Sequence, residues 1–384
     1  MSEKLYHKDS HIFEFEAELL ECRALETGYA LILDRTAFFP EGGGQAADTG
    51  YIGSLRVNDV QERGGEILHF ADSPLEPGRY ACRIDAEQRL RRMQNHSGEH
   101  IVSGIVHNEY GLENVGFHMS AECMTIDFSG ELDWEALMNV ERLANEAVRA
   151  NLPVKAWFPT AEELTELSYR SKCEVTEALR LVKIGEVDLC ACCAPHVAYT
   201  GEIGVIKLFS SERHRGGVRV TLLCGMDALD DYRRRQDGAA AVSQLLSVPR
   251  NDIAPAVRRL LDEQARLKER MGELSRELVA ARSAAYGFTE GNICVFDELL
   301  EDAAQRELVN LLMDKCTGFA AVFSGNDEKG YKYIMGSRHC DLRKAAREIN
   351  AAIDGRGGGR PEMIQGSASA SREKVQKFVE SAHV

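Results

Sequence analysis

Residues 96–111 read HSGEHIVSGIVHNEYG, an apolar run that carries His96 and His100 at its start. The spacing of its apolar residues predicts a helix. Residues four positions apart share one face of a helix, so the two imidazoles can point at a single metal ion. A histidine pair in this register also occurs on helix surfaces and in cores, so the spacing alone leaves the purpose of this pair open.

A second motif, Cys192-Cys193-Ala194-Pro195-His196, carries a thiol and an imidazole four positions apart in a turn that contains proline. Such a turn is a recurrent half-site for zinc, and a set of three histidines and one cysteine is an acceptable tetrahedral donor set. We therefore predict that His96, His100, Cys192 and His196 share one Zn²⁺ ion.

The chain has 384 residues, 44% of them hydrophobic and 28% charged, which is typical of a globular protein with two or three domains. It has no apolar run of membrane-spanning length and no secretory signal pattern at the N-terminus, so we expect a cytoplasmic protein. Eleven cysteines in such a protein favour reduced thiols and metal ligation over disulfides.

Residues 12–90 alternate apolar and polar side chains in short runs broken by Gly, Pro and Asp, which predicts a β-rich domain over residues 1–90. Within it, Thr36 to Gln45 reads TAFFPEGGGQ, with Gly42, Gly43 and Gly44 in a row. Consecutive glycines let the backbone approach a sugar, a phosphate or an ester without steric hindrance. A tight turn without ligand is the alternative, and the Lys-Ser/Thr of a nucleotide-hydrolase phosphate loop is absent.

The remaining chain predicts three further parts, and the fold class that we expect is α+β. Residues 91–225 mix helices and strands around the two candidate metal motifs, and residues 288–384 form a small α/β domain. Residues 226–287 form a helical connector in which apolar residues recur every three or four positions, as in a coiled coil between two chains or a helical spacer: Val257, Leu260, Leu267, Met271, Leu274 and Leu278. The C-terminal part contains GRGGGRPEMIQGSASAS, which we interpret as a glycine-rich loop that ends at a helix N-terminus and suits phosphates.

The net charge of −15 argues against a surface that attracts nucleic acid everywhere, so RNA binding would depend on local basic clusters. The alternative for each cluster is a solvated face. The candidates lie before the histidine motif, in the segment SERHRGGVR and near the C-terminus: Arg89, Arg91, Arg92, Arg213, Arg215, Arg219, Arg338, Arg343, Lys344, Arg347, Arg356 and Arg360.

Together these motifs resemble the editing domain of alanyl-tRNA synthetase and its free-standing relatives, the AlaX trans-editing proteins. The resemblance rests on the Thr36–Gln45 segment, the pair His96 and His100, and the Cys192–His196 turn with the following TGEIG. The segment GRGGGRPEMIQGSA resembles the DHH-associated domain that ends both families, and no aminoacylation domain precedes the editing motifs, as in the long AlaX form.

The resemblance implies a deacylase that hydrolyses the ester of tRNA(Ala) mischarged with serine or glycine. From the apolar repeat we also expect a homodimer through the helical connector or the C-terminal domain. The resemblance also implies that Thr36 and Gln45 recognise the substrate, because alanine would leave buried polar groups unpaired. Further expected contacts to the substrate come from the glycines and arginines named above: Gly42, Gly43, Gly44, Arg92, Arg219, Gly357, Gly358, Gly359 and Arg360.

Four protein ligands would close a tetrahedral site, so whether zinc activates water or orients the ester stays open. Glu99 lies three residues after His96 and is a candidate general base, although a solvent-facing helix glutamate is the interpretation that the pattern favours. The turn also departs from the Cys-Gly-Gly-Thr-His of the synthetases. Cys190 and Cys193 thus become competing thiols, and we assign Cys192 because it preserves the spacing to His196.

Two other functions fit parts of the sequence. His96 to His100 matches the H-x-x-E-H pattern of one class of zinc metallopeptidases, in which a distant glutamate such as Glu174 or Glu177 would be the third ligand. This hypothesis leaves the glycine motif and the Cys-His turn unexplained. A tRNA-binding zinc protein without turnover is the second alternative.

Overall fold

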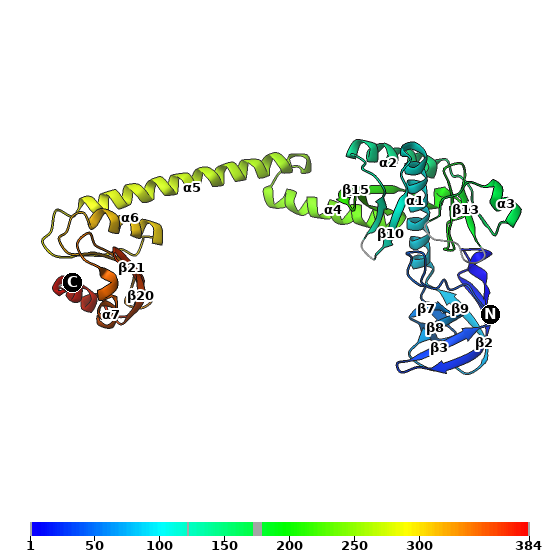
Figure 1. The fold of residues 1–384 in the computed structure, drawn as a ribbon, viewed down its shortest axis with the longest axis horizontal. Helices are drawn as coiled ribbons and strands as arrows, with labels where there is room; N and C mark the ends of the chain where they lie inside the picture. The colour runs from blue at the N-terminus through cyan, green and yellow to red at the C-terminus, as the bar shows by residue number, and fades with distance from the viewer. Residues whose placement is uncertain (1, 121–122, 172–178, 383–384) are drawn as a thin grey trace. The chain divides into compact units, whose positions relative to one another are not determined.

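The computed structural model describes residues 2–120, 123–171 and 179–382, which divide into two compact units, Met1–Ala241 and Val242–Val384 (Figure 1). Each unit contains helices and sheets, so the fold is mixed α and β, as predicted. The division into four parts with boundaries after residues 90, 225 and 287 stays a prediction. Among the described residues, no helix combines the length and the apolar character that a membrane span requires.

The N-terminal segment folds into a seven-stranded antiparallel sheet with the strand order β6-β5-β9-β2-β3-β8-β7. Alternating side chains of these strands are buried, which is the pattern that the sequence predicts. A short parallel pair and a 3-10 turn precede and flank this sheet. The bounds are β1 (Glu3–Lys4), η1 (Leu5–His7), β2 (Glu14–Ala24), β3 (Tyr29–Leu33), β4 (Arg35–Thr36), β5 (Gly50–Ile52), β6 (Leu55–Val57), β7 (Asp59–Arg63), β8 (Glu66–Ala71) and β9 (Gly78–Ile84).

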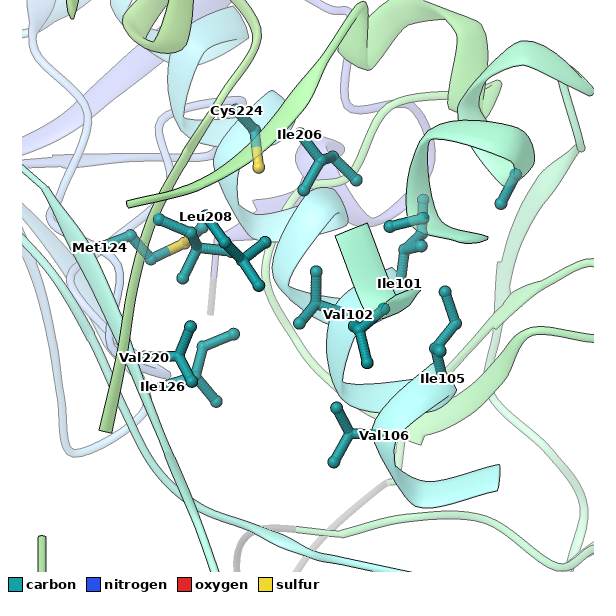
Figure 2. Close-up of a cluster of buried hydrophobic side chains, with 14 of the residues drawn as sticks. Ile101, Val102, Ile105, Val106, Met124, Ile126, Ile206, Leu208, Val220 and Cys224 are labelled. Carbon is teal, nitrogen blue, oxygen red and sulfur yellow. The ribbon is translucent and has the colours of Figure 1, made fainter. Parts of the chain in front are cut away.

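Helix α1 (Ala86–Tyr110) is the centre of the first unit, and it ends at Gly111 in the left-handed conformation, a common helix C-terminus. Every residue from Asn95 to Val106 is buried, because other elements surround this helix. Figure 2 shows its apolar side chains packed against a second sheet, of order β10-β11-β16-β15. A third sheet has the order β12-β13-β14, and β14 also contacts α1.

These surrounding elements follow α1 in the chain. Their bounds are β10 (Asn114–Met119), β11 (Met124–Phe128), α2 (Trp134–Arg149), β12 (Val154–Trp157), α3 (Ala161–Glu166), β13 (Leu181–Ile184), β14 (Asp188–Ala191), η2 (Thr200–Ile203), β15 (Ile206–His214) and β16 (Gly217–Cys224). Three helical segments come next, namely α4 (Gly225–Leu246), η3 (Arg250–Asp252) and α5 (Ile253–Ala284).

The second unit has one sheet of order β17-β18-β19-β21-β20, in which only β17 and β18 pair in parallel. Residues of α5 and α6 share one core with alternate residues of the sheet, and residues of α7 and α8 share another, so helices cover both faces. The bounds are β17 (Ile293–Phe296), α6 (Asp302–Leu312), β18 (Ala320–Asn326), β19 (Gly330–Gly336), α7 (Leu342–Ala352), β20 (Gly355–Arg360), β21 (Met363–Ala368) and α8 (Arg372–Ser381).

The interpretation of the C-terminal glycine segment as a loop is wrong. Gly357, Gly358, Gly359 and Arg360 belong to the edge strand β20, which pairs with β21 along its whole length. Glycine is required at position 357, because a Cβ there would lie 2.3 Å from Tyr333 Oη. The N-cap of the following helix α8 is Ser371, so these glycines do not lead directly into a helix N-terminus.

Candidate metal centre

His96 and His100 lie one turn apart on α1, and both side chains are about 1% exposed. The Cys192–His196 turn follows directly after β14, a strand that packs on α1. Ligand atoms of His96, His100, Cys192 and His196 all lie within 4.8 Å of one another. The structure thus brings together the two motifs from which the sequence predicts one metal site.

The orientation of each imidazole is fixed by a partner on its Nδ1 atom. Nδ1 of His96 lies 2.9 Å from Gln45 Oε1, that of His100 lies 2.8 Å from Asp188 Oδ2, and that of His196 lies 3.0 Å from Ser97 Oγ. Gln45 Oε1 and the Asp188 carboxylate can only accept, so they place a proton on Nδ1 of His96 and of His100 and leave Nε2 to face a metal ion, as in metal-binding histidines. The Ser97 hydroxyl orients the His196 ring but can donate as well as accept.

The Nε2 atoms converge on one sulfur. Cys192 Sγ lies 3.6 Å from His96 Nε2 and 3.4 Å from His196 Nε2. Burial raises the pKa of the Cys192 thiol, but the adjacent His96 and His196 imidazoles outweigh this effect and hold the pKa well below its ordinary value. Three imidazoles and one thiol that ionises readily together form a ligand set that suits zinc.

Protonation of the histidines differs between the two motifs. Burial lowers the pKa of His196 to about 3, so this ring is neutral at physiological pH. Burial also acts on His100, but the hydrogen bond to Asp188 overrides it and raises the pKa of His100 well above its ordinary value. Because a metal ion competes with protons for these atoms, occupancy of the site should depend on pH.

Of the three neighbouring cysteines, only Cys192 lies in this four-residue group. Cys193 is exposed at the outer side of the turn. Cys190 is buried and lies with His100 and Asp188 in a second possible ligand group, which shares His100 with the first.

The glycine segment lies beside the candidate ligands. Gly42 and Gln45 form an isolated β-bridge that closes the bend, and Gln45 reaches His96. Gly44 has a φ of +81°, and a Cβ at this position would lie 2.7 Å from the ring of Phe117. That ring in turn packs against His96, with 5.2 Å between the ring centroids.

Gln45 is about 1% exposed, and its Nε2 group has no hydrogen-bond partner among the described residues. An unpaired buried donor is costly, so its presence beside the candidate ligands is a mark of a binding site. Thr36 is buried as well, but its hydroxyl already contacts His69 Nε2 at 2.8 Å and accepts a hydrogen bond from the Phe38 amide.

The interpretation of Glu99 as a solvent-facing glutamate is wrong, because its side chain is fully buried. Its Oε1 atom accepts hydrogen bonds from Ser103 and Asn114, both at 2.6 Å. Its Oε2 atom lies 3.9 Å from His100 Nε2. Glu99 is buried because α1 is enclosed on all sides, whereas the sequence pattern indicated one exposed face.

Arg89 does not contribute to a basic surface before His96, because its side chain is fully buried. Arg91 forms ion pairs with Asp227 and Asp230, and Arg92 donates to the carbonyl of Ala47 beside the glycine segment. Arg219 pairs with Asp127 through two hydrogen bonds, of 2.6 and 2.8 Å. The roles of Arg92 and Arg219 in substrate binding stay predictions.

Several residues around the centre escaped the sequence analysis. Asp188, Ser97 and Phe117 contact the candidate ligands, and Arg180 donates to the carbonyls of Cys192 and Ala194 and so holds the ligand turn. Only Ser97 had a local signal, since it lies between the two histidines. Glu174 and Glu177, the distant ligands of the peptidase hypothesis, lie outside the described residues.

Three models of known families match the chain. The model of class II (A) tRNA synthetases matches residues 6–86, the threonyl and alanyl tRNA synthetase second additional domain matches residues 179–220, and the DHHA1 domain matches residues 290–383. The second match covers the Cys192–His196 turn, and the third covers nearly all of the predicted C-terminal domain.

Several relatives align with most of this chain. The alanyl-tRNA editing protein AlaX-L of Pyrococcus horikoshii is 27% identical over 98% of this chain and 96% of its own length. Alanine–tRNA ligases of Natronomonas pharaonis and Halobacterium salinarum are 31% and 32% identical over 95% and 87% of this chain. The chain spans only 42% and 38% of the length of these two ligases.

Among solved structures, the C-Ala domain of Aquifex aeolicus alanyl-tRNA synthetase aligns with 25% of this chain at 24% identity and a TM-score of 0.19, a value that supports no conclusion about the fold. The likeness rests on the sequence relatives and on the family models. Over nearly its whole length the chain is similar to a long-form alanyl-tRNA editing protein, AlaX-L, and parts of it match the second additional domain of threonyl and alanyl tRNA synthetases and the DHHA1 domain.

Proposed function

We propose that this protein is a trans-editing deacylase that hydrolyses the ester of tRNA(Ala) mischarged with serine, with glycine as a second substrate. The likeness to the editing protein AlaX-L and the match to the second additional domain support the reaction class. The single observation that carries the proposal is the convergence of His96, His100, Cys192 and His196 next to the buried amide of Gln45.

We propose zinc as the metal of this site, held by His96, His100, Cys192 and His196. The donor set supports this choice, because three imidazoles that are each oriented through Nδ1 and one thiol of lowered pKa suit zinc better than the oxygen-preferring Mg²⁺ or Ca²⁺. Bound zinc would supply Lewis-acid polarisation of the ester carbonyl.

Gln45 would select the substrate through its Nε2 donor. The hydroxyl of a serine ester can accept this hydrogen bond, whereas the methyl of alanine would cover the donor and leave it unpaired. Glycine leaves room for a water molecule at that point, so we expect slower but measurable hydrolysis. Thr36 would act through the loop that it anchors, since its hydroxyl already contacts His69.

Glu99 is the group that we propose as proton acceptor for the attacking water. Its carboxylate is held in place by Ser103 and Asn114, and its second oxygen lies on the side of His100. A general base must be held in a fixed orientation within reach of the reacting water, and the buried carboxylate of Glu99 meets this requirement.

The arrangement of the candidate ligands supports an ester hydrolase over a peptidase. A zinc peptidase of the H-x-x-E-H type takes a glutamate as its third ligand, whereas Cys192 and His196 lie within ligand distance of His96 and His100. The peptidase hypothesis gives the unpaired amide of Gln45 no purpose.

The second unit would bind the body of the tRNA. Arg356 and Arg360 lie exposed on the edge strand β20, on either side of the bare glycines 357–359. An exposed glycine backbone between two guanidinium groups suits a phosphate chain. Replacing both arginines by glutamate should raise the KM for full-length tRNA and leave that for a short acceptor minihelix unchanged; equal changes for both RNAs would contradict a separate contact.

We also propose that α5 mediates homodimerisation. Six of its apolar residues are between 39% and 64% exposed in the single chain: Val257, Leu260, Leu261, Leu267, Met271 and Leu274. A stripe of this kind on a long helix is typical of a coiled-coil seam.

A deacylation assay tests the proposed function. Ser-, Gly- and Ala-tRNA(Ala) would be incubated with the protein, and release of the amino acid would be followed. The proposal requires rapid loss of serine, slower loss of glycine and retention of alanine. Binding of Ser-tRNA(Ala) with an intact ester would instead favour a recognition module without turnover.

A further inference from the structure

Arg89 is the largest fully buried side chain of the described residues, and it lies on α1 seven positions before His96. Seven residues are close to two helical turns, so Arg89 and His96 lie on the same side of α1. A guanidinium with no exposure is retained only where its donors are all used, because burying a charge is costly.

The partners of Arg89 come from two other segments of the chain. Its Nε donates to both carboxylate oxygens of Asp48, at 3.0 and 2.9 Å, and its Nη2 also contacts Asp48. Nη2 further donates to the carbonyl of Ala37 at 2.6 Å, and Nη1 donates to the carbonyl of Ser10 at 3.0 Å. One side chain therefore ties α1 to the start and the end of the glycine segment and to the N-terminal segment.

Each of these segments reaches the candidate metal centre a few residues further on. Asp48 also accepts the amide of Phe39 at 2.7 Å, which closes the segment that carries Gln45 onto His96. The Ser10 hydroxyl accepts the backbone amide of His196 at 3.3 Å. Arg89 thus lies at the junction of the helix that carries two ligands with the supports of Gln45 and His196.

We propose that Arg89, paired with Asp48, is a positioning residue for the deacylation: it sets the distance between Gln45 and the α1 histidines and the placement of the Cys-His turn. The inference rests on the proposed function. It requires arginine, because a lysine carries one compact ammonium group and cannot serve Asp48, Ala37 and Ser10 at once.

A positioning role can be separated from a contribution to stability. Replacing a buried ion pair by apolar residues of similar size often leaves a protein equally stable, whereas removing one partner alone destabilises it. The double variant Arg89→Met/Asp48→Leu therefore keeps the core filled and removes the fork of hydrogen bonds. Misplacement of catalytic groups by about 1 Å costs on the order of 100-fold in rate.

The experiment compares wild type, the double variant and Arg89→Lys as full-length proteins. We expect kcat for Ser-tRNA(Ala) to fall by about 100-fold in the double variant, with the KM and zinc content close to wild type. The thermal midpoint should fall while the protein stays folded, because the Phe39 amide and the Ala37 and Ser10 carbonyls lose a partner. Arg89→Lys should fall between the two. The control variant Arg23→Met/Glu66→Leu removes an ion pair between strands β2 and β8 of the seven-stranded sheet, and it should keep the wild-type kcat.

A folded double variant with a kcat within threefold of wild type would overturn the inference, and so would a loss that appears equally in the control. If the double variant does not fold, Arg89→Lys decides: a wild-type kcat there overturns the positioning role, and a selective loss of kcat supports it. Failure of the proposed function itself looks different, because wild type would then not release serine at all.

Discussion

At the scale of single residues, Cys192 decides whether the two motifs form one site. Its sulfur is the point on which the imidazoles converge, so Cys192→Ser should weaken zinc binding by about 100-fold or more, since a hydroxyl is a poor zinc ligand. Competition with a chromophoric chelator measures this change. The matched control is Cys193→Ser, one position away and exposed, which should bind zinc like wild type. The reverse result would move the thiol ligand to Cys193.

The side-chain oxygen and nitrogen of Gln45 have separate proposed roles. Gln45→Glu keeps an oxygen for the Nδ1 proton of His96 but replaces the buried donor by an acceptor. It should therefore retain zinc and lose about 10- to 100-fold in kcat/KM for Ser-tRNA(Ala), the worth of one hydrogen bond to a buried group. Gln45→Met removes both ends and should also lower zinc affinity. A Gln45→Glu variant that hydrolyses serine esters like wild type would refute the donor role.

His69 makes the stability of the β-rich sheet sensitive to acid. Burial lowers its pKa to about 4, and its Nδ1 lies 3.0 Å from the Leu31 carbonyl. The unfolded chain binds a proton near pH 6.5 and the folded chain only near pH 4, so stability falls as the pH drops through this window, by about 3 kcal/mol in total. Urea unfolding of wild type and His69→Gln should show their difference shrinking from pH 7 to pH 4. A difference that does not change with pH would contradict the neutral buried state.

At the scale of elements, local patterns predicted the strands, the helix that bears the histidines and the four residues that meet in the candidate metal centre. His96 and His100, like Cys192 and His196, lie four positions apart, and such spacings are visible without tertiary structure. The supporting residues Asp188 and Phe117 come from strands β14 and β10, and only packing brings them to the site. Arg89 lies on the same helix as the histidines, but its partners Asp48, Ala37 and Ser10 come from other segments of the chain. The burial of Glu99 was missed for the same reason, because a helix enclosed on all sides has no amphipathic pattern.

For β20 the sequence predicted a loop where the structure has a strand. Its run of glycines has low strand propensity, so the sequence favoured a loop. Pairing with β21 and the close approach of Tyr333 make glycine suitable there, and neither partner can be identified from the segment itself.

The exposed stripe of α5 gives a prediction at the same scale. Wild type should sediment at twice the chain mass of 42.6 kDa at micromolar concentration, and Leu267→Glu/Leu274→Glu should sediment as a monomer, because charges would be buried in the seam. Arg266→Glu, a change of charge beside the stripe, is the control and should remain dimeric. A monomeric wild type would remove the proposed seam.

At the scale of the whole molecule, the proposed function requires an acidic chain to bind an acidic polymer. Several arginines of the predicted basic clusters are already paired or buried, namely Arg89, Arg91 and Arg219. With a net charge of −15, general attraction of RNA is weak, so binding must come from local contacts such as those proposed for Arg356 and Arg360. Under the proposed function, specificity for a mischarged species would then depend on the candidate metal centre rather than on overall charge.

The central claim is that three histidines and one cysteine hold a single zinc ion on which ester hydrolysis depends. The most direct measurement is a zinc titration of chelator-treated full-length protein, in which the rate of Ser-tRNA(Ala) deacylation is recorded at each addition. We predict no activity without metal and a linear rise that ends at one zinc per chain, with Ala-tRNA(Ala) spared throughout. Full activity in the metal-free protein, or a rise that continues well beyond one equivalent, would contradict this account.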